Sequence, residues 1–523
     1  MKKLLVAIFI TLFFAGNAIA QTARITVTVA NTDMSGSIYI FDQQAQLCSL
    51  NRNENYIKLD NKHTGSANID VSSPHTISID FTYNHGNNYL MYVLFLSPGD
   101  DLHINLNFNK ADYTATVTGK GSNNNQQAIQ KLTRINLDQF KQDTLPNRVI
   151  AAINKQSKAN QPALNAYIKQ YAPSAAAIKA IRAEQVYFAT QNYYIFKENN
   201  KFMHMDAYKR NFNKWQGIQD SLFKSAQANN TSALLPIQKD KDGYAGAKLS
   251  DGEALASYNY QQLIFWVLLR ETEKGRMESE ENPKAFYKQW YHTNPTEGKK
   301  RFAADGKNLF TEKVLNHYFS GATAEYLYAS TLRMSILESN YTNIGPLFDH
   351  FKQKYPNSKY INCFSARIAE ALKKQNGALN DRMVFVKDNG SKLNSLKELL
   401  AITKGKTVLI DMWGTWCSPC REEIEAHSAA LHSYFKGKPV DFLYVDNFDV
   451  GKEQQWKKLI AYYQIEGTHI LASDKLTKDM MNKLHFTGYP SYILIKKDGS
   501  CHLTKTQYPI NRQAMIKELE AAM

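Results

Sequence analysis

The stretch IDMWGTWCSPCREEIEAH, residues 410–427, decides the fold of the C-terminal part of this 523-residue chain. An apolar run and a short aromatic turn precede Cys417, and Cys420 follows three positions later at the start of a charged stretch. Two cysteines at this spacing have several interpretations: a redox pair, half of a metal site, a structural disulfide, or two inert thiols. The neighbouring residues discriminate among them.

Two of these interpretations explain the pattern poorly. A structural zinc site needs four ligands, and a second close Cys or His pair is missing, because His427, His432 and His469 are isolated in the sequence. A disulfide across two intervening residues closes a small loop and therefore stabilises the fold little. A redox pair and two inert thiols remain as alternatives at this point.

The residues before Cys417 favour the redox pair. Residues 408–412 (VLIDM) predict a buried strand, and the charged residues after the turn predict a helix that begins at the cysteines. A thiol at a helix start faces unpaired N–H groups and the positive end of the helix dipole, which lower its pKa. Cys417 is thus the expected nucleophile, and Cys420 is placed to attack a mixed disulfide held on it. Pro419 suits the first helical turn.

Strands and helices alternate around this stretch, over residues 381–523. Residues 383–394 (MVFVKDNGSKLN) predict a hairpin or strand-turn, and the apolar runs near 407–413, 440–448 and 491–504 predict further strands. Helical periodicity separates them. The pattern predicts an α/β domain whose sheet is covered by helices on both faces.

The front of the chain has a different character. Residues 23–118 alternate apolar and polar side chains with a period of two, which predicts an antiparallel β domain, a sandwich or a partly closed barrel. A polar, turn-prone run at 119–125 is expected to be a linker. Residues 126–375 are helical in pattern, and their aromatic stripes are expected to pack as core. The predicted domains are 21–119, 120–375 and 376–523.

The first twenty residues resemble a secretory signal. Lys2 and Lys3 precede an apolar run at 4–15, and Ala18-Ile19-Ala20 has the small-x-small pattern of a cleavage site. We expect the mature chain to begin at Gln21 and to be exported to the periplasm of a Gram-negative cell envelope. The apolar run is shorter than the roughly 20 residues that a spanning helix needs.

Charge and cysteine content narrow the function classes. The formal net charge is +15, but Lys and Arg are interleaved with acidic and amide residues, so a nucleic-acid partner is not expected. A metal is not expected either, because a second close pair of Cys or His ligands is missing. The five cysteines are too few for a disulfide scaffold. We interpret Cys48, Cys363 and Cys501 as buried small apolar residues, while their pairing stays open.

The segment WGTWCSPC (413–420), with Asp411 before it and Gly488-Tyr489-Pro490-Ser491 downstream, resembles the thioredoxin superfamily. More narrowly, it is similar to the exported TlpA/ResA-like thiol-disulfide oxidoreductases. The resemblance covers residues 381–523. Related exported proteins of Bacteroidetes-type bacteria place similar β and helical regions ahead of the redox domain.

This resemblance implies roles for single residues. Asp411 stands in the place of the family's buried acid and would move a proton to and from Cys420 through water. Pro490 matches the family's cis-proline, and the backbone of Tyr489 would pair with an extended substrate segment. Trp416 would cover one side of the sulfurs, while Trp413 is expected to pack in the core.

The expected function is an exported thiol-disulfide oxidoreductase that reduces protein disulfides without a cofactor. The Ser-Pro dipeptide between the cysteines resembles reducing members of the family. Disulfide-containing client proteins and a membrane thiol reductant would be its partners. Two alternatives stay open: a thiol peroxidase, and a partner- or ligand-binding protein with an accessory thioredoxin domain.

Overall fold

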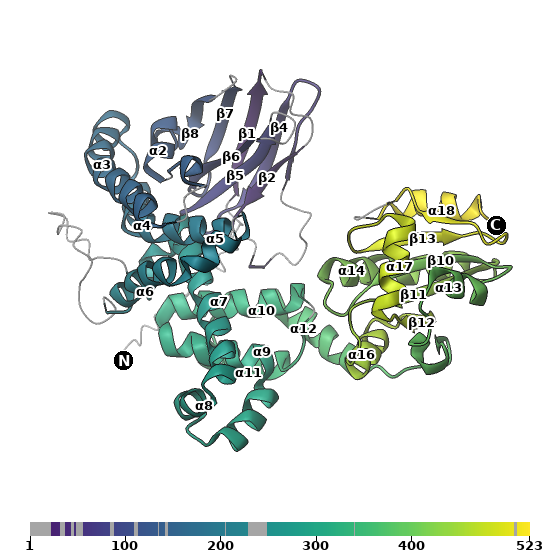
Figure 1. Ribbon diagram of the computed structural model, residues 1–523. Helices are drawn as coiled ribbons and strands as arrows, with labels where there is room; N and C mark the ends of the chain where they lie inside the picture. Colours follow the sequence, from purple (N-terminus) through teal and green to yellow (C-terminus); the bar gives the residue numbers. More distant parts are fainter. Residues whose placement is uncertain are drawn as a thin grey trace, which may run out of the picture. The chain divides into compact units, whose positions relative to one another are not determined.

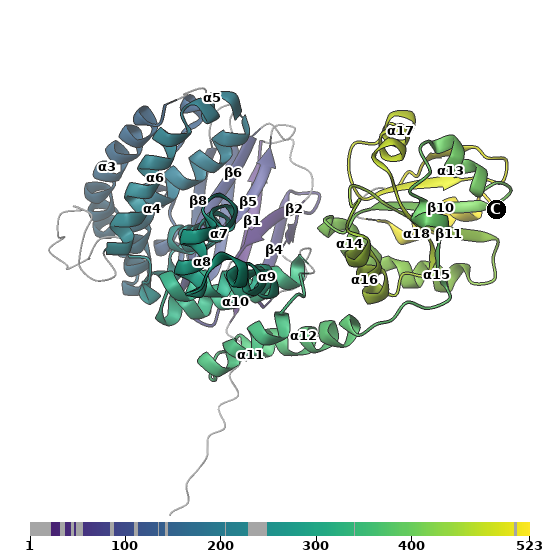
Figure 2. The same ribbon diagram turned by 60° about the horizontal axis from the view of Figure 1, so that its bottom comes forward.

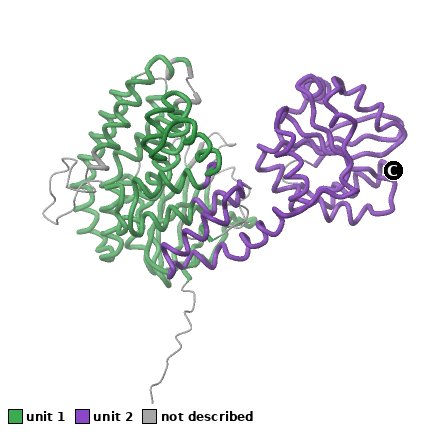
Figure 3. Tube along the Cα trace, turned by 90° about the horizontal axis from the view of Figure 1, so that it is seen from below, with its two compact units in different colours: residues 1–305, 309–330 green, residues 306–308, 331–523 purple. Residues whose placement is uncertain are grey.

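The computed structural model describes residues 22–31, 37–42, 47–48, 56–83, 88–108, 113–133, 135–141, 145–203, 205–228, 248–338, 340–506 and 510–523. The predicted signal segment and Gln21 lie outside these residues. The chain divides into two compact units, one of residues 1–305 and 309–330 and one of residues 306–308 and 331–523 (Figure 3).

The first unit opens with a β-sandwich, as the alternating pattern predicted (Figure 1). One sheet has the order β4-β1-β7-β8 and the other the order β3-β2-β5-β6. Their inward-facing aliphatic side chains share one core. The strands are β1 (Thr22–Ala30), β2 (Ser37–Phe41), β3 (Tyr56–Lys58), β4 (Thr64–Asp70), β5 (His75–Tyr83), β6 (Asn88–Leu96), β7 (Asp101–Phe108) and β8 (Tyr113–Lys120).

Two details of this sandwich differ from the sequence prediction. β1 pairs in parallel with β7, so the domain is not purely antiparallel. The polar run expected to be a linker is packed: the buried Asn125 side chain accepts from Phe95 N at 2.7 Å and donates to Phe95 O at 2.9 Å. Gln130 pairs with Val93 N and O in the same way. These amides satisfy backbone groups along β6, the edge strand of its sheet, and so cover that edge.

Helices follow the sandwich up to residue 375, as predicted. Most of their aromatic side chains are buried, among them Tyr187, Phe188, Tyr193 and Tyr260, so the aromatic stripes pack as core. The helices are α2 (Gln130–Thr133), α3 (Asn147–Tyr171), α4 (Ala175–Met203), α5 (Met205–Arg210), α6 (Phe212–Ala228), α7 (Tyr258–Glu281), α8 (Pro283–Tyr291), α9 (Pro295–Tyr318), α10 (Gly321–Leu337), α11 (Ile344–Lys354) and α12 (Ile361–Gln375).

The C-terminal sheet has six strands in the order β14-β13-β10-β11-β12-β9. β10, β11, β12 and β9 run parallel, while β13 is antiparallel to both β10 and β14. The strands are β9 (Met383–Phe385), β10 (Thr407–Trp413), β11 (Val440–Asp446), β12 (Gly467–Leu471), β13 (Ser491–Ile495) and β14 (Cys501–Leu503). Residues 383–394 do not form the hairpin that was an option: β9 pairs with β12 and a single turn follows it.

Helices cover both faces of this sheet, as predicted (Figure 2). They are α13 (Leu396–Ile402), α14 (Ser418–Glu423), α15 (Ala429–Phe435), α16 (Glu453–Tyr463), α17 (Asp474–Leu484) and α18 (Arg512–Glu520). Val408, Ile410 and Met412 of β10 pack toward α13 and α17. Because side chains alternate along a strand, Asp411 and Trp413 face the other side, where α14, α15, α16 and α18 lie.

The compact units do not end where the secondary structure changes. The last residues of α10, from Thr331 on, belong with α11 and α12 to the unit that contains the C-terminal sheet. None of the helices in the described part of the chain is long and apolar enough to cross a membrane.

Candidate redox site

The two cysteines form a disulfide at the end of the central strand. β10 is buried along its whole length, and the chain turns after Trp413 so that Cys417 becomes the N-cap of α14. The Cys420 N–H points at Cys417 Sγ at a distance of 3.2 Å. Pro419 occupies the first helical turn, where a missing N–H costs no hydrogen bond. The two sulfurs form a disulfide bond, and the Cα atoms of Cys417 and Cys420 are 5.3 Å apart.

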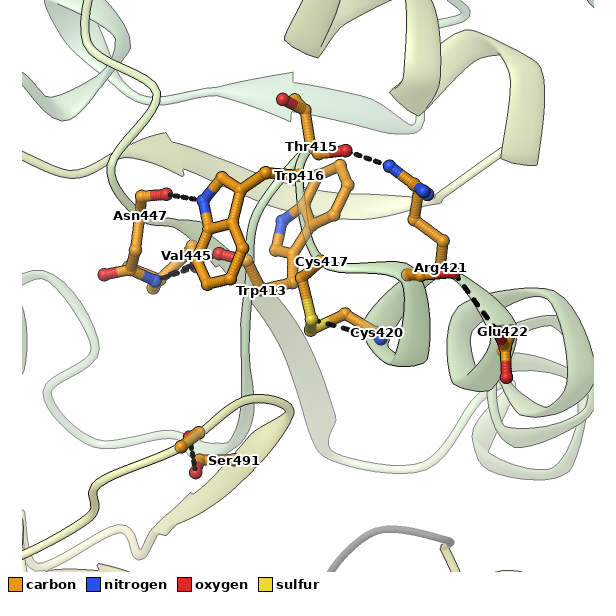
Figure 4. Close-up of a disulfide and its surroundings, with 12 residues drawn as sticks. Trp413, Thr415, Trp416, Cys417, Cys420, Arg421, Glu422, Val445, Asn447 and Ser491 are labelled. Carbon is orange, nitrogen blue, oxygen red and sulfur yellow. Dashed lines mark hydrogen bonds between the residues drawn. A yellow bond between two sulfur atoms is a disulfide. The ribbon is translucent and has the colours of Figure 1, made fainter. Parts of the chain in front are cut away.

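The turn before Cys417 is fastened to the end of β11. The Trp416 indole N–H donates to the Asn447 carbonyl at 2.8 Å, and the Asn447 amide donates in turn to the Trp413 and Val445 carbonyls (Figure 4). Thr415 donates through its N–H and its hydroxyl to Asp449, at 2.7 and 2.9 Å. These bonds fix the loop that presents the disulfide.

Aromatic side chains surround the exposed side of this loop. Trp416 is 47% exposed, and its ring lies 5.4 Å from Tyr489 and 6.2 Å from Phe448. The Tyr489–Pro490 peptide bond is cis, the geometry that the resemblance implied. Burial, with the nearby Asp446 as a second cause, raises the pKa of Tyr489 to about 12. Trp413 is fully buried and packs in the core, as expected.

Asp411 lines a small cavity of about 20 Å³ that Glu423 and Ile424 also line. Burial is the main cause that raises the pKa of its carboxyl to about 8, and the neighbouring Glu423 adds to the shift. Ile424 and Tyr444 line this cavity and also pack in the cluster that contains both cysteines, so the carboxyl and the disulfide are neighbours across these two side chains. A cavity of this volume holds about one water molecule.

Glu423 is a residue that the sequence reasoning missed. It lies three positions after Cys420 on the same helix face and lines the Asp411 cavity. Its carboxylate accepts from Ile510 N at 3.0 Å and lies 3.5 Å from His427 Nε2. Burial raises the pKa of Glu423 above its ordinary value. The signal in the sequence was a glutamate three positions after Cys420, one helical turn after the cysteine pair.

The loop after β11 was missed as well. Asp446 and Asp449 are fully buried beside Thr415, and burial, with the charge of Asp449, raises the pKa of Asp446 well above its ordinary value. Phe448 between them has a left-handed backbone with φ of 62° and a ring that is 45% exposed. A bulky residue in this conformation is a backbone outlier. Nothing in the sequence predicts it.

The remaining cysteines differ from their predicted environment. The prediction that Cys48, Cys363 and Cys501 are buried is wrong, because Cys48 is exposed and the other two are half-buried. Cys501 on β14 is a free thiol, and its partial burial raises its pKa. Among the described residues, no group of three His, Cys, Asp or Glu side chains gathers as metal ligands.

Comparisons with known proteins agree with this geometry. Residues 405–501 match a family model described as thioredoxin-like. The thiol-disulfide oxidoreductase ResA of Bacillus cereus is 31% identical over 131 residues, which are 25% of this chain and 69% of the relative. ResA of Bacillus subtilis is 34% identical over 115 residues, 22% of this chain and 58% of the relative.

One solved structure is similar to part of the chain. The crystal structure of the thioredoxin domain of a thiol-disulfide oxidoreductase from Bacteroides vulgatus is 26% identical and covers 23% of this chain and 84% of its own, with a TM-score of 0.21. The residues matched by the family model include the disulfide, the strand before it and the cis-proline loop. Through its C-terminal domain, the chain belongs to the thioredoxin-like thiol-disulfide oxidoreductases related to ResA.

Proposed function

We propose that this protein is exported to the periplasm and reduces disulfides in client proteins. The observation that carries the proposal is the Cys417–Cys420 disulfide at the start of a helix, beside a cis Tyr489–Pro490 bond and a half-exposed Trp416. A helix start stabilises a thiolate on Cys417, which is the form that attacks disulfides. The relatives named above are called thiol-disulfide oxidoreductases, which supports the same chemistry.

In the proposed reaction, the Cys417 thiolate attacks one sulfur of a client disulfide. The bond between the client sulfurs breaks, a mixed disulfide forms, and the other client sulfur leaves as a thiolate that takes up a proton. Cys420 loses its proton and attacks Cys417, which releases the second client sulfur and leaves the oxidised pair. A membrane thiol reductant, the second proposed partner, then donates two electrons to restore the dithiol.

Asp411 is the proposed acceptor of the Cys420 proton. Its raised pKa, about 8, keeps the carboxyl able both to hold and to release a proton near neutral pH. The cavity that it lines has room for one water that would carry the proton. Trp416, Tyr489 and Pro490 are the proposed contacts of the client segment, because the half-exposed Trp416 ring lies next to the disulfide and against Tyr489, which Pro490 follows.

Trapping of mixed disulfides tests the proposal. We expect Cys420→Ser to accumulate mixed disulfides with client proteins, since nothing resolves them, and Cys417→Ser to accumulate none. Cys501→Ser is the matched control, because Cys501 is a free, half-buried thiol outside the pair, and its loss should leave trapping unchanged. Equal trapping by both variants of the pair, or by neither, would contradict the proposal.

Direction and export have their own measurements. The redox potential of the Cys417–Cys420 pair is measured by equilibrium with glutathione. A reductant should have a potential well below that of glutathione, whereas a potential well above it would mean that the protein oxidises its clients. Export predicts that the full-length chain, expressed in a Gram-negative host, is recovered from the periplasm with Gln21 as its first residue. Recovery of the uncleaved chain would contradict this.

One observation speaks against the thiol peroxidase alternative. Thr415 is the threonine closest before Cys417, and its buried hydroxyl donates a hydrogen bond to the Asp449 carboxylate at 2.9 Å. Because its proton is used in this bond, the hydroxyl does not donate to a peroxide at the cysteine. A stopped-flow assay should show slow consumption of peroxide by the reduced protein.

A second candidate function, binding of a partner by the helical region, is favoured by a groove of about 500 Å³ among α4, α6 and α7. Trp266, Leu269 and Met277 line it beside the buried Lys197, which donates to Gln216 Oε1 at 3.0 Å. Its volume lies in the range of ligand sites. If it selects clients, Met277→Glu in the Cys420→Ser chain should change which proteins are trapped, while insulin reduction by Met277→Glu alone stays at the wild-type rate.

A further inference from the structure

The end of α10 is hydrogen-bonded to the first turn of α14, next to the disulfide. The Ser418 hydroxyl, which lies between the two cysteines in sequence, donates to the Leu337 carbonyl at 2.9 Å. The Arg421 guanidinium donates to the Thr415 carbonyl before Cys417 (Figure 4). It also donates to the Glu338 carbonyl. Both cysteines and the final turn of α10 belong to the same compact unit.

The two helix ends that meet here have opposite polarity. The last carbonyls of a helix lack partners within it and carry about half a negative charge, whereas the first N–H groups carry about half a positive charge. α10 is 17 residues long and ends at Leu337, so Leu337 and Glu338 present the negative end. Cys417 is the N-cap of α14 and sits at the positive end. The negative end of α10 is therefore hydrogen-bonded to the same helical turn whose positive end lies at Cys417.

Neighbouring contacts hold α12 against the redox domain. Glu425 forms ion pairs with Arg367 at 2.7 Å and with Lys374 at 2.8 Å, both on α12. Burial raises the pKa of Glu425, but the hydrogen bonds from these two cations outweigh it and hold the pKa below its ordinary value. Tyr341, between α10 and α11, stacks on Tyr462 of α16 with ring centroids 4.9 Å apart.

We propose that the docked C-terminal end of α10 is a built-in determinant of the redox potential, and that it makes the Cys417–Cys420 dithiol a stronger reductant. Reduction of this disulfide by a dithiol takes up two electrons and one proton and leaves a thiolate on Cys417 and a thiol on Cys420. The Leu337 and Glu338 carbonyls destabilise that thiolate, and the Ser418 hydroxyl has the Leu337 carbonyl at 2.9 Å and the Glu422 carboxylate at 3.2 Å as its acceptors, instead of the sulfur. The disulfide form is thereby favoured. This inference rests on the proposed function.

Two substitutions loosen the docked segment without altering any residue of the disulfide turn. Glu425→Lys replaces two ion pairs by repulsion, and Tyr341→Ala removes the ring stacked on Tyr462 without a change of charge. For each full-length variant, we expect the equilibrium constant with glutathione to shift about tenfold toward the dithiol, which is roughly 30 mV toward a more oxidising potential. The alkylation rate of Cys417 should also reach its plateau at a lower pH than in the wild type.

Two controls separate loss of docking from a direct effect of charge. Glu425→Lys combined with Arg367→Glu and Lys374→Glu restores opposite charges across the contact, and its potential should return toward the wild-type value. Glu520→Lys makes the same change of charge at an ion pair with Lys438, away from α12, and should leave the potential unchanged. Amide hydrogen exchange of α11 and α12 should rise in the two loosened variants and fall back in the combined one.

The outcome decides the inference separately from the proposed function. If Glu425→Lys and Tyr341→Ala both stay within twofold of the wild-type equilibrium constant, or shift it toward the disulfide, the role of α10 is overturned, while reduction of clients is untouched. If the wild-type protein itself neither traps nor reduces disulfides, the proposed function fails first. A tenfold shift in both variants with recovery in the combined one supports the inference.

Discussion

The side chains of Asp411 and Glu423 line one small cavity, and the charge of Glu423 contributes to the raised pKa of Asp411, about 8. One acid comes from the central strand and the other from the helix that begins at Cys417. Two buried carboxyls this close do not both ionise readily, because each charge disfavours the other and burial disfavours both. The cavity therefore retains a proton near neutral pH.

Asp411→Asn should change how stability depends on pH. The pKa of Asp411 is raised in the folded state, so the stability that its protonated form contributes is complete below pH 4 and is lost as the pH rises toward about 8. The loss is at most about 1.4 kcal/mol per pH unit in that window. We expect urea denaturation to show that the variant lacks this decline and is the more stable protein at pH 8. Parallel curves for both proteins would contradict the raised pKa.

The same substitution should slow the release of clients. Asparagine cannot accept the Cys420 proton, so resolution of the mixed disulfide should slow by on the order of 100-fold near pH 7, as is usual for loss of a general base. The first attack by Cys417 should change much less. Stopped-flow measurement of both steps with a peptide disulfide checks this, and an equal slowing of the two steps would argue against a role in resolution.

Glu423→Gln should lower the pKa of Asp411 while leaving it above its ordinary value. The substitution removes the neighbouring charge, but burial, the larger cause, remains. The titration of the Asp411 carboxyl, followed by isotope-edited infrared spectroscopy, should move to lower pH. Glu422→Gln is the matched control, because Glu422 is adjacent in sequence and does not line the cavity. A shift in the control and none in Glu423→Gln would contradict the shared cavity.

The sequence predicted those parts of the site that local pattern determines. The buried strand 408–412 became β10, and the helix begins at the cysteines, because an apolar run, an aromatic turn and Pro419 specify both elements locally. The six residues from Asp411 to Cys417 comprise the end of the strand and the turn before the helix. The role of Asp411 as the buried acid was implied by the resemblance, and strand alternation places it on the same face of the sheet as Trp413.

Other parts depend on contacts that leave no pattern in the sequence. The bonds from Ser418 and Arg421 are accepted by main-chain carbonyls, which every residue has, so Leu337 carries no sign of its role. The polar run at 119–125 was interpreted as a linker because polar residues are common in loops, whereas Asn125 is buried against the β6 backbone. Tertiary hydrogen bonds decided both cases.

Asn447→Ala should destabilise the fold through unsatisfied backbone groups. The side-chain amide of Asn447 donates to the Trp413 and Val445 carbonyls at 3.2 and 2.8 Å, and its oxygen accepts from Thr477. Alanine removes the side-chain donor to the Val445 carbonyl and the acceptor of the Thr477 hydroxyl, while the Trp413 carbonyl keeps the bond from the backbone N–H of residue 447 at 2.9 Å; we expect a cost of about 2 kcal/mol. Chemical denaturation checks the change. Asn376→Ala, at an exposed position after α12, should cost far less, and equal costs at the two sites would contradict this explanation.

Phe448→Gly should weaken client capture without a loss of stability. Phe448 has φ of 62°, a conformation that costs non-glycine residues about 1 kcal/mol and glycine almost nothing, so the free energy of unfolding should stay the same or rise by up to that amount. Its half-exposed ring lies 6.2 Å from both Trp416 and Tyr489, where a client segment would pass. Losing about 1 kcal/mol of apolar contact predicts a roughly fivefold rise in KM for a peptide disulfide, with kcat unchanged.

His485→Gly is the control that separates strain from contact. His485 also has a left-handed backbone, with φ of 57°, but it is exposed at the end of α17 and has no ring contact with Trp416. Its replacement should relieve strain in the same way and leave KM unchanged. If Phe448→Gly instead destabilises the protein by several kcal/mol while KM stays constant, the ring supports the fold and does not contact clients. A rise in KM confined to Phe448→Gly assigns this strained residue to client binding.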